Sequence, residues 1–416
     1  MLIDLKMAWR NIWRNPRRTL LTVLAIAFAC VLLIFMLSFQ FGSYDTMINA
    51  SVKINTGHLQ IQARGYQQNK KMRLVIPDPA PLKQVLGSMP FVEAYTCRAQ
   101  AFALVSSDKR SYGVVVVGVE PETEEKVSTL GSIIQKGDYL TRAPEDPHLS
   151  GALVGRVLAR NLKVDIGDEL TILGQGRDGS VAATVLKVQG IYGSGMDEFD
   201  RSAIHIPLEA FQDIFFMQKA VHEIVVICDH LSSVQKIKSR LQNLVKDFPE
   251  MTQQPVVLDW NELMPGLRQA IRMDLVSGGI FYLILILVVA FSILNTFLMA
   301  ILERTHEFGV MMAVGTRPDR LTRLVLTESA GMTLVGVGAG VVLGCLLTWY
   351  FQVHGIEIAG SSEILRQYGI PSRLYPRLSL LSASTGPAAV FVITSVSALY
   401  PALKIRRLTP VEALNA

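Results

Sequence analysis

Four long apolar stretches set the strongest limit on what this chain can fold into. They lie at residues 19–42, 275–302, 325–351 and 378–403, and Glu328 is the only charged residue within them. Each stretch is as long as the roughly 20 residues that an α-helix needs to cross a bilayer. Only 18% of the 416 residues are charged, against about 25% in soluble domains. The sequence therefore predicts an α-helical membrane protein with four transmembrane helices.

Basic residues gather on one side of these helices. The segments 1–18, 303–323 and 404–416 together hold 12 Lys and Arg against 5 Asp and Glu, whereas residues 43–273 hold 25 against 26. Because cytoplasmic segments carry the excess of Lys and Arg, the three basic segments are predicted to be cytoplasmic. The domain at 43–273 and the loop at 352–377 are then predicted to lie on the other side of the membrane.

The first segment, residues 1–18, is predicted to be a cytoplasmic amphipathic helix. Its apolar residues recur at helical spacing, and Lys and Arg occupy the opposite side. Such a helix suits the surface of the cytoplasmic leaflet, with Trp9 and Trp13 at the level of the lipid headgroups. A plain basic flank that only orients the first span is the alternative.

Residues 43–273 are predicted to form an α/β domain inserted between the first and second transmembrane helices. A helix-then-strand unit lies near 80–105, and a strand-then-helix unit lies near 223–258. These units are expected to be two halves of one domain, with a β-rich insertion at about 130–210 between them.

A glycine-rich turn lies inside this insertion, between two predicted strands. Its residues are Gly174, Gln175, Gly176, Arg177, Asp178 and Gly179. The turn is similar to a phosphate-binding loop, but Ser180 and Val181 follow where Lys and Ser or Thr are needed. The sequence therefore predicts an exposed hairpin turn.

Patterns that indicate catalysis or metal binding are absent from the sequence. The seven histidines show no ligand spacing, and four cysteines exclude a disulfide-rich scaffold. Cys97 and Cys228 are the two cysteines outside the apolar stretches. Two buried free thiols are favoured over a disulfide between them, because free cysteine is often buried. No enzyme and no metal site is predicted.

Small residues recur along one face of the third apolar stretch. Gly336, Gly340 and Gly344 follow each other at intervals of four, which allows another helix to approach closely. A glycine-rich membrane helix without special packing is the alternative, because glycine is common in such helices.

The segment 303–323 combines charged residues with an apolar run. Phe308, Met311 and Met312 are spaced i, i+3 and i+4, so they share one face of a helical turn. The spacing predicts a short helix that docks on a partner protein through these three anchors. A loop whose apolar residues touch lipid headgroups is the alternative.

Motifs along the whole chain resemble FtsX-like ABC-transporter permeases. They are AWRNIWRNPRRTLLTVLAI near the N-terminus, Glu307-x-Gly309 followed by Ala313-Val314-Gly315, and the tail Pro401-Ala402 with Pro-Val-Glu-Ala-Leu at 410–414. TGHLQIQARGYQ at 56–67 is most like the LolC/LolE-type lipoprotein-releasing branch. The order of one span, a large domain and three spans also matches. His306 and Thr316-Arg317-Pro318 depart from the family pattern.

The resemblance implies a permease subunit without catalytic activity of its own in the inner membrane of a bacterium. Two permease chains, identical or homologous, would bind two cytoplasmic ABC ATPase subunits. ATP and Mg²⁺ would bind to the ATPase, so no cofactor is expected on this chain. The large domains, in the periplasm, would extract or transfer a lipoprotein or another lipidic cargo. A MacB-like efflux or mechanotransmission permease and an FtsX-like signalling permease without cargo are the alternatives.

The resemblance also implies which residues couple the permease to the ATPase. They are Glu303, Arg304, Glu307, Phe308, Gly309, Met311, Met312 and Gly315. Glu307 is expected to meet a basic residue of the ATPase, and Gly309 and Gly315 are expected to allow close approach of the backbone. The hairpin turn at 174–179 is expected to contact a periplasmic carrier that receives the lipoprotein.

Overall fold

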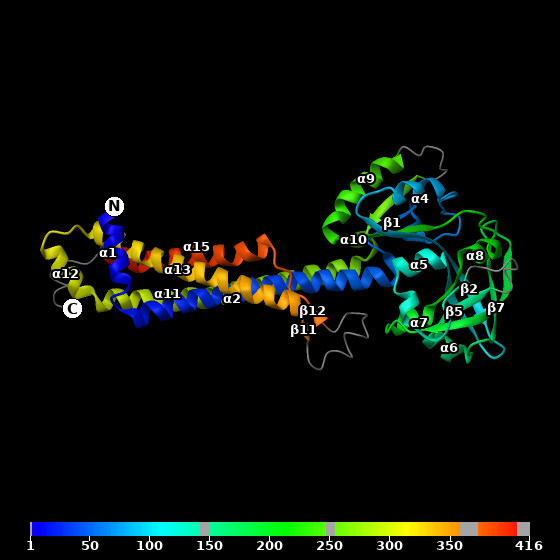
Figure 1. Cartoon of the computed structure of the whole chain (residues 1–416), viewed down its shortest axis with the longest axis horizontal. Helices are drawn as coiled ribbons and strands as arrows, with labels where there is room; N and C mark the ends of the chain where they lie inside the picture. Colours follow the sequence, from blue (N-terminus) through cyan, green and yellow to red (C-terminus); the bar gives the residue numbers. More distant parts are fainter. Residues whose placement is uncertain (1, 142–149, 247–253, 358–372, 406–416) are drawn as a thin grey trace. The chain divides into compact units, whose positions relative to one another are not determined.

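The computed structural model describes residues 2–141, 150–246, 254–357 and 373–405 (Figure 1). These residues divide into two compact units. A helical unit comprises the chain up to Tyr44, Ala270–Glu357 and the described residues from Arg373 onward, and an α/β unit comprises the described part of Asp45–Gln269. The tail motif at 410–414 and most of the loop predicted at 352–377 lie outside the described residues.

Helices build the first unit. Their bounds are α1 Leu2–Ile12, α2 Pro16–Ser51, α11 Pro265–Glu303, α12 Thr305–Ala313, α13 Pro318–His354 and α15 Leu380–Ile405. Two short strands, β11 Ile356–Glu357 and β12 Arg373–Leu374, pair with each other. The helices α2, α11, α13 and α15 are long and apolar enough to cross a membrane, and each overlaps one of the four predicted spans.

One apolar core joins the helices of this unit. It is built from buried side chains of α1, α2, α11, α13 and α15, among them Ile12, Cys30 and Met332. Large apolar side chains also cover the outside of the unit, above all on α11. The buried residues of α11 are Ile293, Phe297 and Ile301. An outer surface this apolar is suited to lipid rather than water.

Within the described residues, ten strands of the α/β unit form one mixed sheet. The order is β10-β1-β9-β2-β3-β8-β5-β7-β4, and β6 pairs with both β2 and β7. The bounds are β1 Leu59–Ala63, β2 Val92–Ser106, β3 Ser111–Val119, β4 Ile134–Gly137, β5 Gly151–Gly155, β6 Glu169–Gln175, β7 Val181–Tyr192, β8 Ala203–Pro207, β9 Glu223–Cys228 and β10 Pro255–Asp259.

Short helices connect these strands and cover the sheet. Their bounds are α3 Tyr66–Asn69, α4 Ala80–Gly87, α5 Pro121–Val127, α6 Arg156–Leu162, α7 Asp197–Ser202, α8 Leu208–Ile214, α9 Val234–Lys246 and α10 Trp260–Leu263. A π-helical turn, η1 Val52–Thr56, continues directly from α2, and two 3₁₀ turns, η2 Leu130–Ile133 and η4 Leu231–Ser233, complete the unit.

The strand pairings close a circuit of six strands. β2 pairs with β3, β3 with β8, β8 with β5, β5 with β7, β7 with β6, and β6 again with β2. β2 has two partners on one side because Val92–Arg98 pairs with β9 and Ala103–Ser106 pairs with β6. The strands of the segment predicted as an insertion, 130–210, therefore share one sheet with the rest of the unit.

The other part of the sheet is a layer of β10, β1, β9 and the first half of β2. Leu82 of α4 and Leu241 of α9 are buried in its apolar core. The two sequence units predicted as halves of one domain meet here, where β2 pairs with β9.

The two cysteines of the α/β unit lie on these neighbouring strands. Cys228 of β9 is opposite Val92, and Cys97 of β2 is opposite Ile224. Both are buried free thiols, and burial raises the pKa of each thiol to about 12. The preference for free cysteines over a disulfide is confirmed.

Candidate functional sites

The segment between the second and third long helices contains α12 and a tight turn. α12 ends at Ala313, and Gly315 has a φ of 101°, in the left-handed region that favours glycine. The N–H groups of Gly315 and Thr316 donate to the carbonyls of Met312 and Met311 at 3.0 and 2.9 Å, and α13 begins three residues after Gly315. The segment 303–323, predicted as one coupling helix, therefore contains α12, a turn and the start of α13.

The side chains that α12 turns inward are the ones predicted to face a partner. Phe308 and Met312 are 0% and 8% exposed, and they pack in a cluster with Leu321 and Val325 of α13 and Ala402 of α15. The expectation that both anchors lie on an open face is wrong, because the apolar ends of α13 and α15 already cover them. Their part in coupling, like that of half-buried Met311, stays a prediction.

A different set of residues forms the exposed side of α12. His306, Val310, Ala313 and Val314 are exposed and recur at helical spacing. Val310 is 45% exposed and Val314 is 83% exposed. We call these four residues the outer face of α12. Sequence spacing alone could not separate this face from the buried one, because both sides of the short helix carry apolar residues.

Charged side chains tie α12 to α1 and to α13. Glu307 forms ion pairs with Arg14, which follows α1, and with Arg304 at 3.4 Å. Arg304 also pairs with Glu328 of α13 at 2.8 Å, and the Asn11 amide donates to Glu328 at 2.6 Å. The hydrogen bond from Arg14 holds the pKa of Glu307 below its ordinary value. Because Glu307 is engaged inside its own chain, the expectation that it meets a basic residue of an ATPase is not supported.

A second ion pair runs parallel to the first. Arg18, near the start of α2, pairs with Glu303 at the end of α11 at 3.1 Å. The two arginines are four residues apart, and so are Glu303 and Glu307. This matched spacing was visible in the sequence, and it is the signal that could have predicted the network. Exposed pairs of this kind contribute only about 0–1 kcal/mol each to stability.

The glycine stripe of α13 lies against α2. A Cβ atom placed at Gly340 would come within 2.6 Å of the Cys30 Cβ and 2.7 Å of the Ala27 carbonyl oxygen. Gly336 and Gly344 meet other residues of α2 in the same way. The close approach expected from the spacing therefore takes place within one chain.

The glycine-rich turn joins β6 to β7, which pair as a hairpin. The turn is held against the end of α8, because the Arg177 N–H donates to the Phe215 carbonyl at 2.9 Å and Gly176 lies against the Phe216 ring. Asp178 accepts from the Ser180 hydroxyl at 2.6 Å. The predicted hairpin exists, but it is anchored rather than free. Its contact with a carrier stays a prediction.

An apolar surface lies on the neighbouring strands β2, β6 and β7. Alternation along each strand turns large apolar side chains outward, and they are 39% to 75% exposed. We call this surface the apolar sheet face; its residues are Phe102, Leu104, Leu173, Val181 and Val185. Leu104 and Leu173 are direct cross-strand neighbours. Exposed apolar patches of this kind mark sites where proteins bind one another or bind apolar ligands.

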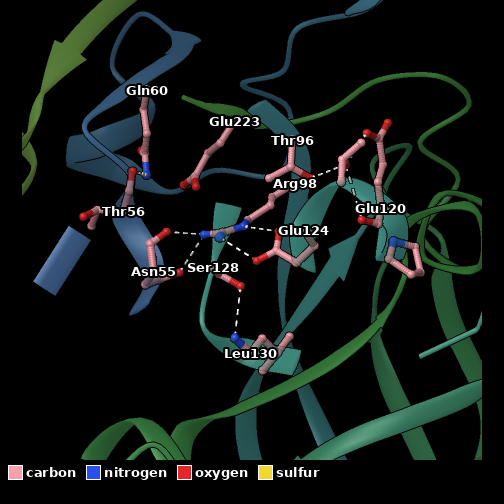
Figure 2. A network of polar contacts seen from close by, with 12 residues as sticks. Asn55, Thr56, Gln60, Thr96, Arg98, Glu120, Glu124, Ser128, Leu130 and Glu223 are labelled. Atoms are coloured by element: carbon pink, nitrogen blue, oxygen red, sulfur yellow. Dashed lines mark hydrogen bonds and ion pairs between the residues drawn. The ribbon is translucent and has the colours of Figure 1, made fainter. Parts of the chain in front are cut away.

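Figure 2 shows a buried polar network at the end of α2, where the helix continues into η1. Arg98 of β2 pairs with Glu124 of α5 through two hydrogen bonds of 3.0 and 2.7 Å, and both side chains are buried. The same guanidinium donates to the side-chain and main-chain oxygens of Asn55 in η1. Burial disfavours charge on Glu124, but Arg98 holds the pKa of its carboxyl below the ordinary value.

This network fixes the end of α2 to the sheet at more than one point. The Thr129 N–H donates to the Lys53 carbonyl at 3.0 Å, and His58 hydrogen-bonds Asn49 of α2 at 3.0 Å. Sequence reasoning missed the network, because single Arg, Glu and Asn residues far apart in the chain have no spacing that indicates a contact.

No group of three or more His, Cys, Asp or Glu side chains is placed to hold a metal ion within the described residues.

Two protein-family models match the chain. The model described as a MacB-like periplasmic core domain matches residues 19–244, which is more than half of the chain. The model described as the FtsX-like permease C-terminal domain matches residues 279–410.

Several named proteins are similar along most of the chain. The lipoprotein-releasing system transmembrane protein LolC of Xylella fastidiosa (strain 9a5c) is 22% identical over 95% of this chain and 92% of its own length. The corresponding LolE protein of Haemophilus influenzae is 24% identical over 80% of this chain and 78% of its own length. The pyoverdine export ATP-binding/permease protein PvdT of Pseudomonas fluorescens is 24% identical over 100% of this chain and 60% of its own length.

Four helices of membrane-spanning length, with an α/β unit inserted after the first, define a multi-pass membrane protein with one large extramembrane domain. The core-domain model matches the first helix and the α/β unit, and the permease model matches the later helices. The chain therefore belongs to the FtsX-like permeases with a MacB-like core domain, a family of ABC-transporter permease subunits.

Proposed function

We propose that this chain is the permease subunit of an ABC transporter that moves lipoproteins, or another lipidic cargo, out of a bacterial inner membrane. The observation that carries the proposal is the similarity to LolC along nearly the full length of both chains. The apolar sheet face gives physical support, because an exposed apolar surface on the large domain suits a cargo or a receiving protein with apolar groups.

The proposal assigns ATP hydrolysis to partner chains. Two copies of a cytoplasmic ABC ATPase bind ATP and Mg²⁺, and a second permease chain, identical or homologous, completes the assembly. This chain then binds no cofactor and has no catalytic activity of its own. The printed name of PvdT combines ATP binding with a permease, and this chain is similar to 60% of that protein.

In this account α1 and α12 receive the movement of the ATPase together. The outer face of α12 provides the contact, and the ion pair between Arg14 and Glu307 makes α1 follow α12. α2 is one continuous helix from Pro16 to Ser51, and the Arg98 network holds its far end to the sheet. Movement at the cytoplasmic end can therefore reach the α/β unit as a rigid-body shift.

A second candidate function is export of a small molecule. PvdT is similar to all of this chain, over 60% of its own length, and the fold is compatible with either cargo. Deletion of the gene for this chain separates the two functions. Release of lipoproteins to an acceptor is lost in the first case, and secretion of a small molecule, or resistance to it, is lost in the second.

The orientation can be tested with single cysteines in intact spheroplasts. A cysteine at Lys109 or Arg177 of the α/β unit is expected to react with a membrane-impermeant thiol reagent. A cysteine at Arg317 is expected to react only after the membrane is ruptured, because the basic segments are proposed to be cytoplasmic. The reverse pattern of labelling would exclude the orientation.

Purification from native membranes tests the proposed assembly. An affinity tag on this chain is expected to recover an ATP-hydrolysing subunit in equal amount, together with a second permease chain, as identified by mass spectrometry. Recovery of the chain alone under mild detergent conditions, from cells that express the neighbouring genes, would count against the proposal.

A further inference from the structure

A cavity of about 680 Å³ lies between the start of α2 and the end of α11. Its polar rim contains Arg17 and Arg18 of α2 and Glu303 of α11. Arg18 is paired with Glu303 at 3.1 Å, so these two charges compensate each other. Arg17 is exposed and makes no hydrogen bond or ion pair in the described part of the chain. Among the residues that the structure describes, the rim therefore carries one uncompensated positive charge.

The chemistry of the lining changes along the depth of the cavity. Asn295 and Met299 of α11 line its lower part, together with Leu21 of α2. An α-helix rises about 1.5 Å per residue, so Asn295 lies roughly 12 Å from Glu303 along α11. The order is charge at the rim, apolar side chains below, and an amide deeper still.

The amide of Asn295 needs a polar partner in this position. The side chain is exposed on a helix of membrane-spanning length, and it makes no hydrogen bond within the described residues. In hydrocarbon an unpaired amide is costly. An ester carbonyl of a phospholipid would accept from this amide, while the phosphate of the same molecule reached Arg17 at the rim.

The surroundings of the cavity place it at a membrane surface. Trp9 and Trp13 of the nearby α1 region are 53% and 58% exposed, and tryptophan is enriched at the level of lipid headgroups. Leu21 and Leu24, about one and two helical turns after Arg17 in α2, are 69% and 52% exposed. These side chains would contact acyl chains rather than water.

We propose that this cavity is a binding site for an acidic phospholipid of the cytoplasmic leaflet. Arg17 holds the phosphate, Asn295 donates to an ester carbonyl, Leu21 and Met299 lie beside the glycerol between them, and the exposed apolar surface beyond, which includes Leu24, contacts the acyl chains. The single uncompensated positive charge favours a headgroup with net negative charge over a zwitterionic one. Because the site joins α2 to α11 beside the Arg18–Glu303 pair, the bound lipid would stabilise the end of the unit that carries α12.

Native mass spectrometry of the full chain, released from detergent after incubation with defined lipids, tests this site. Phosphatidylglycerol is expected to remain bound, and phosphatidylcholine to be lost. Arg17→Gln is expected to weaken phosphatidylglycerol binding about fivefold, since one basic residue near a lipid surface contributes about 1 kcal/mol. Asn295→Leu is expected to weaken it without a change in charge. Arg10→Gln, which removes an exposed arginine outside the cavity, is the matched control and should have little effect.

Four results would overturn the proposal. Equal losses for Arg17→Gln and Arg10→Gln would mean that only the total charge attracts lipid. Equal retention of phosphatidylcholine would remove the role of the positive rim. Displacement of the lipid by millimolar inorganic phosphate would indicate a site for a free anion. A loss of permease dimer in Arg17→Gln, with lipid binding unchanged, would assign the cavity to a protein contact.

Discussion

Replacing Arg98 with alanine is expected to lower the free energy of unfolding of the α/β unit by about 3–5 kcal/mol, which is the usual result of removing one partner of a buried ion pair. The substitution leaves Glu124 buried without its cation, and Asn55 loses the donor that fixes η1 to the sheet. Hydrogen exchange of the β2 and β9 amides in the purified chain measures the change, because these strands pair next to Arg98.

Two further variants separate this effect from general damage. Arg156→Ala removes one partner of an exposed pair, at 3.3 Å from Asp197, and should change stability by less than about 1 kcal/mol. Arg98→Met combined with Glu124→Leu should recover much of the loss, because two apolar side chains of similar size leave no buried charge. If Arg98→Ala and Arg156→Ala lower the protection of these amides from hydrogen exchange by the same amount, the network does not stabilise the unit.

Aspartate at both Val310 and Val314 is expected to release the ATPase subunit from the permease. These residues are the exposed apolar part of the outer face of α12. Losing one hot-spot residue at the centre of an interface costs about 2 kcal/mol or more. Affinity should therefore fall at least about 30-fold. The measurement is the ratio of ATPase to permease after affinity purification from native membranes.

Val181→Asp is the matched control, because this valine is 71% exposed on the apolar sheet face. This variant should leave ATPase retention unchanged. Phe308→Ala makes a second comparison. It is expected to lower stability through a cavity in the cluster with Leu321 and Val325, without a specific loss of the ATPase from the protein that remains folded. Full retention of the ATPase by the double aspartate variant would exclude the outer face as the contact.

The sequence was sufficient to predict the membrane spans, the inserted domain and several of its elements. Length and lack of charge predict the spans directly, and the helix-then-strand unit near 80–105 and the strand-then-helix unit near 223–258 follow from the spacing of their apolar residues. The glycine stripe was predictable as a packing surface, because its spacing of four already defines one helix face. These features depend on periodicity along the chain, which a single sequence contains.

Features that depend on contacts between distant segments were beyond the sequence. Whether Phe308 or Val314 faces outward depends on the ends of α13 and α15, which cover one side of α12. The closed circuit of strands depends on β2 changing its partner from β9 to β6 along its length. The anchoring of the turn at 174–179 depends on a backbone hydrogen bond from Arg177 to Phe215, which no residue type indicates.

The central claim is that this chain couples ATP hydrolysis to the removal of a lipidated cargo from the membrane. The direct measurement is release of a labelled lipoprotein from proteoliposomes that contain the permease with the ATPase recovered alongside it. The account predicts release to a soluble acceptor only with ATP and Mg²⁺, and loss of release with the Val310 and Val314 aspartate variant. Equal release with and without ATP, while the ATPase hydrolyses ATP at its normal rate, would contradict it.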